Sequence, residues 1–200
     1  MSSKMIRTAA LAVLFMLSFS LRVFADTIPT LTLDPPNGAL TGPAGSTVGW
    51  GFTLANPGND FLVVSGSDFC VGIITSPCSN ALGTYTDFAG QQFFVFGPAP
   101  EDASLTQAFD NTLQLGMGSF LINPGATGSV NGFIALSYDL FSVDPNSLDF
   151  NPDTDTISNG NILTAPASVT VGAVSSAPEP PALALLLGAL GALLFLRKRP

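Results

Sequence analysis

The sequence predicts an all-β protein: a single antiparallel β-sandwich, immunoglobulin-like or jelly-roll, flanked by an N-terminal signal helix and a C-terminal short transmembrane helix. Short runs rich in Val, Ile, Phe and Thr alternate with clusters of Gly, Pro, Asn and Asp, which is the pattern of strands and turns. No sustained 3.6-residue periodicity occurs between the two apolar end segments. Residues 26–174 are numerous enough to bury one core, so we expect a single domain there.

The first residues of the chain have the parts of a secretory signal peptide. Lys4 and Arg7 form a basic region, and an apolar segment follows at residues 9–19. A cleavage site of small residues ends in Ala25, so we expect the cut between Ala25 and Asp26. The apolar segment is too short to span a bilayer, which argues against a retained anchor.

Alternation of apolar and polar residues predicts the strands of the domain in order. The clearest case is residues 46–55, where four apolar side chains share one face by the period of two: Val48, Trp50, Phe52 and Leu54. Trp50 is the sole tryptophan, and we expect it in the core. The expected strands are residues 30–33, 46–55, 61–64, 91–96, 105–115, 119–122 and 161–174, with turns at 34–38, 56–60 and 97–102. Within residues 124–136, a Pro-Gly turn leads into a further alternating strand.

Two of these segments share one order of residue types. Residues 43–54 and 124–136 each contain Pro, a Gly-containing turn, Ser, Val, Gly, an aromatic residue and Leu. This order resembles that of immunoglobulin-like bacterial surface domains. Repeated hairpins in any β-sandwich would produce the same order, so both interpretations stay open.

Basic residues occur only near the two ends of the chain. They are Lys4, Arg7, Arg22, Arg197, Lys198 and Arg199, and there is no histidine. Thirteen of the fourteen acidic residues lie between Asp26 and Ala177. A domain without bases repels polyanions, so we expect no nucleic acid partner. It also lacks the residues for His-based triads, Lys Schiff bases, Arg clamps and His-containing zinc sites.

The charge distribution therefore predicts a protein that is not an enzyme, with no obligatory cofactor. A negative charge of this size favours solubility and resistance to aggregation. A glycosidase needs only two carboxylates, so the absence of basic residues does not exclude that activity. Its candidate acids are Asp68, Asp87, Glu101, Asp102 and Asp110.

Cys70 and Cys78 are the only cysteines. Behind a signal peptide, two cysteines most simply form one disulfide. Closing so short a loop would stabilise the fold by roughly 2–3 kcal/mol in the chain-entropy estimate. The alternative is a reactive thiol or metal pair, but no base lies nearby to lower a thiol pKa.

One segment is crowded with oxygen-bearing side chains: Asp144, Asn146, Asp149, Asn151, Asp153 and Asp155. Part of it has the every-second-residue spacing that begins a calcium loop, and Ca²⁺ takes six to eight oxygen ligands. It departs from the EF-hand rule because Thr154 replaces the required Gly and no Glu closes the loop. Calcium binding and a cation-free cluster of turns both remain open.

Residues 178–200 have three parts in a fixed order. A short linker leads to the triplet Pro178, Glu179, Pro180; residues 182–196 contain only Ala, Leu, Gly and Phe; and the basic end is Arg197, Lys198 and Arg199. As a helix, residues 182–196 would be roughly 22 Å long, shorter than the ~30 Å bilayer core. The basic end favours the cytoplasmic side. A permanent tail anchor is one interpretation.

The same arrangement resembles the PEP-CTERM sorting signal of proteins exported by Gram-negative bacteria that make extracellular polysaccharide. The resemblance implies recognition by an exosortase-type enzyme of the inner membrane, with cleavage at or near the triplet. Glu179 would then be recognised by the processing enzyme and would not be catalytic. The chain would divide into a signal peptide (1–25), an exported β-sandwich domain (26–174) and a sorting signal (175–200).

We therefore expect a non-enzymatic cell-surface or extracellular-matrix protein associated with exopolysaccharide. Its route would use the secretion machinery and signal peptidase, then transient anchoring in the inner membrane, then release to the cell envelope, surface or matrix. The alternative is a calcium-assisted carbohydrate-binding or adhesive module, in which Tyr85, Tyr138 or Trp50 would stack on sugars.

Overall fold

The structure, a computed structural model, describes residues 28–172 apart from 75–77, 79 and 101–102. This part of the chain contains ten strands and almost no helix, which confirms the predicted all-β class. Its helical elements are η1 (Pro36–Gly38), η2 (Ala89–Gln91) and α2 (Pro152–Asp155). The expected signal helix and the expected membrane helix at 182–196 lie outside the described residues. Within those residues, no helix has the length and apolar character needed to cross a membrane.

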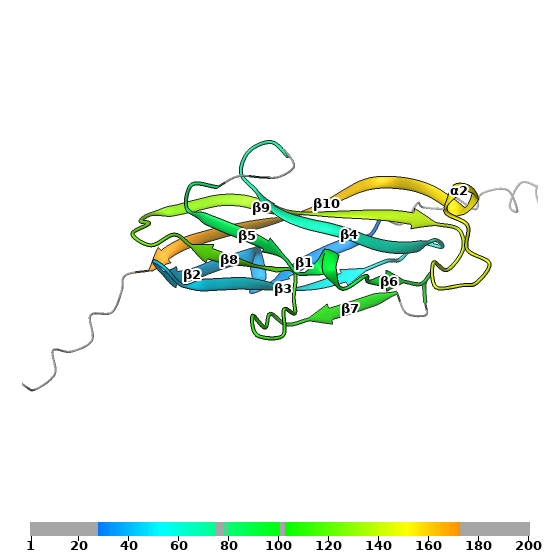
Figure 1. Cartoon of the computed structure of the whole chain (residues 1–200), viewed down its shortest axis with the longest axis horizontal. Coiled ribbons are helices and arrows are strands. Elements are labelled where there is room, and N and C mark those ends of the chain that lie inside the picture. The colour runs from blue at the N-terminus through cyan, green and yellow to red at the C-terminus, as the bar shows by residue number, and fades with distance from the viewer. Residues whose placement is uncertain (1–27, 75–77, 79, 101–102, 173–200) are drawn as a thin grey trace, which may run out of the picture.

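The strands form two sheets that pack face to face as a β-sandwich (Figure 1). In the first sheet, β7 (Ser104–Gln107) pairs with β3, and the main order is β1 (Thr30–Asp34), β3 (Thr47–Ala55), β8 (Gly118–Ile122) and β5 (Gly83–Asp87). In the second sheet, the order is β2 (Ala39–Pro43), β10 (Thr156–Gly172), β9 (Ser129–Phe141), β4 (Phe61–Cys70) and β6 (Val95–Phe96).

The prediction of a wholly antiparallel sandwich is wrong at one pair of strands. β2 and β10 run parallel, with Ala39 opposite Ser168 and Pro43 opposite Gly172. This pairing arises because the chain leaves the first sheet after β1 and crosses to the second through η1. Gly38 makes the crossing possible: its φ is 61°, and a Cβ there would collide with the Pro166 carbonyl oxygen.

Several strand boundaries differ from the predicted ones. Residues 91–96 are not one strand, because only Val95–Phe96 pair and η2 ends at Gln91. Residues 105–115 are not one strand either. β7 ends at Gln107, and the following turn is closed by two backbone hydrogen bonds, of 2.9 and 3.0 Å, exchanged between Asp110 and Leu115.

Other predicted strands are confirmed in part. Residues 30–33, 46–55 and 119–122 correspond to β1, β3 and β8 within a residue or two. The predicted strand at 61–64 is only the start of β4. The strand predicted after the turn within residues 124–136 belongs to β9, and β10 begins before the predicted strand at 161–174. The sequence did not predict β2 or β5, whose short runs contain Gly and exposed Thr.

The core lies between the sheets and is built on aromatic side chains. Trp50 is fully buried, as predicted, and its indole N–H donates a 2.8 Å hydrogen bond to the Gly38 carbonyl oxygen. Its ring lies 5.3 Å from that of Phe69 and 6.5 Å from that of Phe120. Because β3, β4 and β8 supply these rings, the contacts hold the two sheets together.

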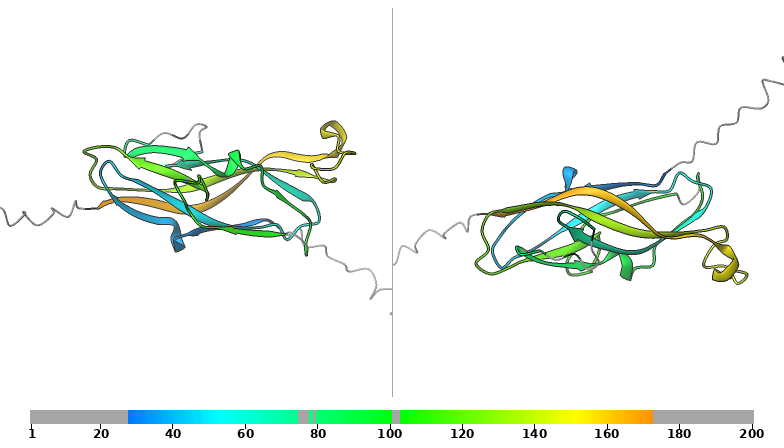
Figure 2. Two further views of the ribbon diagram at one scale, coloured as in Figure 1. Left: turned by 60° about the horizontal axis from the view of Figure 1, so that its bottom comes forward. Right: turned by 90° about the horizontal axis from the view of Figure 1, so that it is seen from above.

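The two ends of the sandwich differ in charge. α2 projects at one end of the long axis, whereas β10 finishes at the other (Figures 1 and 2). We call the first end the acidic pole. It contains the loops at residues 56–60, 97–100 and 142–155, and its acids are Asp60, Asp144, Asp149, Asp153 and Asp155. At the β10 end, the loops at residues 44–46 and 123–128 contain no acidic residue.

Candidate functional site

The predicted calcium segment forms turns that are stabilised by its own side chains. Asp144 Oδ1 accepts a 2.9 Å hydrogen bond from the Asn146 amide. Asn151 Oδ1 caps α2 by accepting from the Asp153 amide at 3.1 Å, and Asp155 Oδ2 accepts from the Asn151 amide at 2.8 Å. Three of the six candidate ligands therefore already accept backbone hydrogen bonds.

The carboxylates of this segment do not converge on one point. Over the part of the chain that the structure describes, one group of three Asp, Glu, His or Cys ligand atoms lies within 4.8 Å, and it is Asp68, Cys70 and Cys78. That group is outside the predicted segment. Calcium binding at residues 144–155 stays a prediction, with the turn contacts favouring a cation-free cluster.

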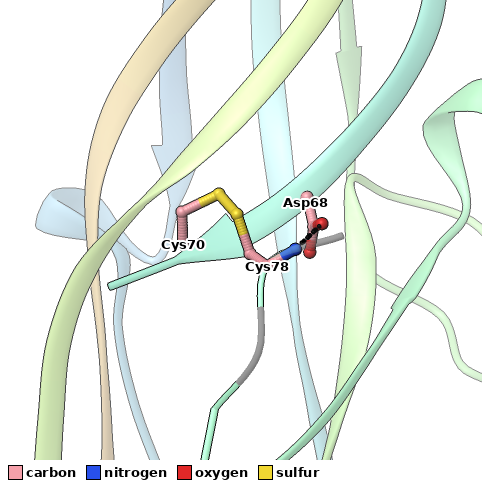
Figure 3. A group of neighbouring side chains, drawn as sticks. All are labelled: Asp68, Cys70 and Cys78. Carbon is pink, nitrogen blue, oxygen red and sulfur yellow. Dashed lines mark hydrogen bonds between the residues drawn. A yellow bond between two sulfur atoms is a disulfide. The ribbon is translucent and has the colours of Figure 1, made fainter. Parts of the chain in front are cut away.

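The group at Asp68 is organised by a disulfide (Figure 3). Cys70 and Cys78 are bonded, with Cα atoms 5.0 Å apart, which confirms the predicted pairing. Asp68 Oδ2 accepts from the Cys78 amide at 2.7 Å and Asp68 Oδ1 from the Phe69 amide at 2.8 Å. Metals bind thiolates and not disulfide sulfurs, so this group is not a metal site. We interpret Asp68 as a structural residue that holds the loop closed by the disulfide, through its hydrogen bond with the Cys78 amide.

A second polar cluster connects the two sheets. The Ser67 hydroxyl on β4 donates to the Asp87 carboxylate and lies 2.7 Å from the Tyr85 hydroxyl on β5. The Tyr85 hydroxyl also donates to the Met117 carbonyl oxygen at 3.1 Å. Burial of this hydroxyl raises the pKa of Tyr85, and the Asp87 and Asp68 charges add to the effect, although the hydrogen bond with Ser67 lowers it.

This cluster lies beside a pocket of about 460 Å³ that includes Ser67, Asp68, Asn80, Thr84, Tyr85 and Asp87. Two candidate acids of the glycosidase hypothesis, Asp68 and Asp87, thus share one pocket. Both accept backbone amide hydrogen bonds, Asp68 from Phe69 at 2.8 Å and Asp87 from Gly90 at 3.1 Å, so each carboxylate also stabilises the local backbone.

Asp110, another candidate acid, is not among the residues that line this pocket. Asp110 Oδ1 accepts from the Thr112 and Leu113 amides, so it stabilises its own turn. Glu101 and Asp102 lie outside the described residues.

The aromatic residues predicted to stack on sugars are badly placed for it. Trp50 is 0% exposed and Tyr138 is 7% exposed, so neither presents a ring face to solvent. Tyr85 is half-buried, and its hydroxyl is engaged between the sheets. The carbohydrate-binding alternative is therefore wrong about Trp50 and Tyr138 as stacking residues.

A different pocket occurs at the acidic pole. Its volume is about 320 Å³, and its lining includes Phe61, Phe94, Leu105, Ser104, Asp144 and Asn146. We call it the pole pocket. The pocket brings the aromatic rings together with Asp144 and Asn146, the first two residues of the predicted calcium segment. The sequence did not connect the rings with these two residues, because they lie far apart along the chain.

Asn56 fixes the wall of the pole pocket. It is 2% exposed, and its side-chain amide donates to the carbonyl oxygens of Asp60 at 2.7 Å and Gly97 at 3.1 Å. Its backbone amide donates to the Ala103 carbonyl oxygen at 2.7 Å. Sequence reasoning assigned Asn56 only to a turn, because its buried partners are some forty residues away along the chain.

The predicted sorting residues Pro178, Glu179, Pro180, Arg197, Lys198 and Arg199 lie outside the described residues. The predicted cleavage residues Ala25 and Asp26 do so as well. The structure therefore bears on residues 28–172 and not on the predicted processing signals.

No family model matches the chain, and no curated protein matches it. Among solved structures, it is similar to SSP-19, an MSP-domain protein like family member of Caenorhabditis elegans, at 17% identity and a TM-score of 0.33 over 70% of this chain and 99% of that one. WR4, an MSP family member of the same animal, gives 10% identity and 0.33 over 71% and 97%. At such TM-scores the likenesses carry no argument about function.

Proposed function

We propose that the chain is an exported, non-enzymatic protein of the cell surface or extracellular matrix, sorted by a C-terminal PEP-CTERM signal and associated with exopolysaccharide. The observation that carries this proposal is the fixed order of Pro178-Glu179-Pro180, the apolar segment 182–196 and the basic end. The signal peptide at residues 1–25 supports it, since export must precede sorting at the membrane.

The domain suits a passive role at the surface. Every Lys and Arg lies in an end segment, so the exported domain would carry only acidic charge. Such a domain stays soluble and resists self-association at high local concentration. We also infer that the sandwich is immunoglobulin-like and not a jelly-roll, because β1-β3-β8-β5 and β10-β9-β4 correspond to the ABED and GFC orders of that fold.

The proposal gives the domain an orientation. β10 ends at Gly172, and the Pro-Glu-Pro triplet begins only a few residues later at Pro178. An anchor attached there would hold the sandwich by its uncharged end. The acidic pole and its pocket would then face away from the membrane.

Replacement of the central glutamate tests the sorting proposal in the native host. We expect Glu179→Ala to accumulate as an uncut chain in the inner membrane, whereas the unmodified protein reaches the outer envelope or the medium. Glu101→Ala is the matched control, because it removes the other glutamate of the chain and should leave sorting unchanged. Equal distribution of the Glu179→Ala variant and the unmodified protein would contradict the proposal.

A further inference from the structure

We propose that the pole pocket binds one uncharged sugar unit of a polysaccharide. The inference deepens the proposed function by assigning its contact with polysaccharide to one site. It replaces the aromatic residues predicted from the sequence with Phe61 and Phe94.

The lining of the pocket matches the two-sided chemistry of a sugar. A pyranose ring has an apolar C–H face and a rim of hydroxyl groups. Phe61, Phe94 and Leu105 supply apolar surface, and both phenylalanine rings are only half-buried. A volume of about 320 Å³ is at the lower end of the range for small-molecule sites, which suits one sugar unit and not a long chain segment.

The polar side chains of the pocket supply both acceptors and donors. Asp144 uses Oδ1 in its turn, which leaves Oδ2 as a carboxylate acceptor toward sugar hydroxyls. The Asn146 side chain provides amide donors and an acceptor, and Ser104 provides a hydroxyl. Hydroxyl groups both donate and accept, so this set can satisfy them without any basic residue.

The charge of the acidic pole selects against anionic sugars. Asp60, Asp144 and Asp149 belong to this pole, and residues 28–172 contain no Lys, Arg or His. A uronic acid or a sulfated sugar would meet repulsion with no cation from the protein to offset it. The ligand class is therefore an uncharged hexose or N-acetylhexosamine.

The pocket is organised before any ligand binds. Asn56 ties the turn at residues 56–60 to Gly97, which lines the pocket, and to Ala103, which precedes the lining residue Ser104. A preformed site loses little conformational entropy on binding. Its place at the pole opposite the end of β10 leaves it accessible when the chain is held by its C-terminal side.

Saturation-transfer NMR on the full-length chain in a sugar-free zwitterionic detergent tests the proposal. The probes are the methyl glycosides of glucose, galactose, mannose and N-acetylglucosamine, with methyl glucuronide as the charged comparison. We expect transfer to the ring protons of at least one neutral glycoside, with a dissociation constant on the order of 1 mM, and weaker transfer to the glucuronide.

Four variants locate the site. Asn146→Ala removes an exposed side chain, and Asp144→Asn keeps the oxygen that accepts from the Asn146 amide. Both should weaken neutral-sugar binding about fivefold. Asp149→Asn, which makes the same charge change in the same segment, and Asn131→Ala, on an exposed part of β9, should leave it unchanged.

The inference would be overturned by the absence of transfer to any neutral glycoside, or by equal binding by the Asn146→Ala and Asp144→Asn variants and the unmodified chain. Preference for the glucuronide would also overturn it, since the repulsion argument would then be wrong. The sorting proposal is tested separately, by the distribution of the Glu179→Ala variant in the host. If the protein is sorted correctly but binds no sugar, this inference is wrong and the sorting proposal stands. If the protein binds sugar but keeps its C-terminal segment, the sorting proposal is wrong and this inference stands.

Discussion

Tyr85 and Trp50 are both aromatic, yet their surroundings give them different roles. Trp50 packs among Phe69, Phe120 and Tyr85 and uses its one donor on the Gly38 carbonyl oxygen, so it joins the core to the crossover at η1. Tyr85 places its hydroxyl between the sheets, against Ser67. The sequence could predict the burial of Trp50 from alternation in residues 46–55. It could not predict the partner of Tyr85, because Ser67 lies on another sheet.

The raised pKa of Tyr85 gives a pH dependence of stability with a definite sign. An unfolded tyrosine loses its proton near pH ~10. Burial raises the pKa of Tyr85 in the folded protein, so the folded state keeps the proton where the unfolded state releases it. The stability from this effect is complete below about pH 10 and falls as the pH rises above it.

Urea unfolding followed by circular dichroism measures this dependence. We expect the free energy of unfolding to fall between about pH 9 and about pH 11, and to fall less in Tyr85→Phe, which keeps the ring and removes the titrating group. Residues 28–172 contain no lysine, and the structure leaves no cysteine free, so few other groups change charge in this range. Parallel loss of stability in both proteins would show that Tyr85 is not the cause.

At the scale of the element, the crossover between β1 and β2 decides the topology. Because of this crossover, β1 pairs with β3 in the first sheet, whereas β2 pairs with β10 in the second sheet. The β2–β10 pair is parallel. The turn at residues 34–38 was predictable from its Pro, Asn and Gly residues. The change of sheet was not, because it depends on the close approach of Gly38 to Pro166, far along the chain.

Glycine substitutions separate close packing from backbone strain at this crossover. Gly38 and Gly45 both have positive φ, of 61° and 82°, but only at Gly38 would an added Cβ meet other atoms within 4 Å. Gly45→Ala should cost about 1 kcal/mol, from the left-handed backbone alone. Gly38→Ala should cost at least about 2 kcal/mol, because the Pro166 backbone must also move. Thermal and urea unfolding of both variants would measure the difference, and equal costs would contradict the packing argument.

Strand prediction succeeded where alternation was regular and failed where turns interrupted it. β3 was predicted almost to the residue because four apolar side chains repeat at a period of two, and three of them, Trp50, Phe52 and Leu54, are buried. Residues 105–115 looked like a strand because they contain several apolar side chains, yet Asp110 accepts from two following amides and forces a turn. Side-chain acceptors of this kind override β-propensity locally.

At the scale of the molecule, the sequence predicted a domain without bases but not the separation of its charge. The acids of residues 60 and 144–155 are distant in sequence, and the antiparallel pairing of β4 with β9 brings them to one pole. The same pairing brings Phe61 to the end of the sandwich where Asp144 and Asn146 line the pole pocket. Asp144 and Asn146 were candidate residues from the sequence, whereas Phe61, Phe94 and the buried Asn56 could be connected with them only through the fold.

Calcium and magnesium distinguish a specific site from general screening of the acidic pole. Since Asp144, Asn151 and Asp155 already accept backbone hydrogen bonds, we expect both ions at equal concentration to raise the melting temperature equally, through screening alone. Differential scanning calorimetry compares the two ions. A rise specific to calcium that is lost in Asp153→Asn would contradict this expectation and establish a calcium site in residues 144–155.

We propose that the chain is exported, cut near the Pro-Glu-Pro triplet and passed to the cell surface. The intact mass of the protein recovered from its own host, with the cell fractions kept separate, tests this most directly. We expect a chain that begins at Asp26 and ends near Pro178-Glu179-Pro180, found outside the inner membrane, and any added mass at the new end would identify an attached group. A chain in the inner membrane that still carries Arg197, Lys198 and Arg199 would contradict the claim and make it a tail-anchored protein.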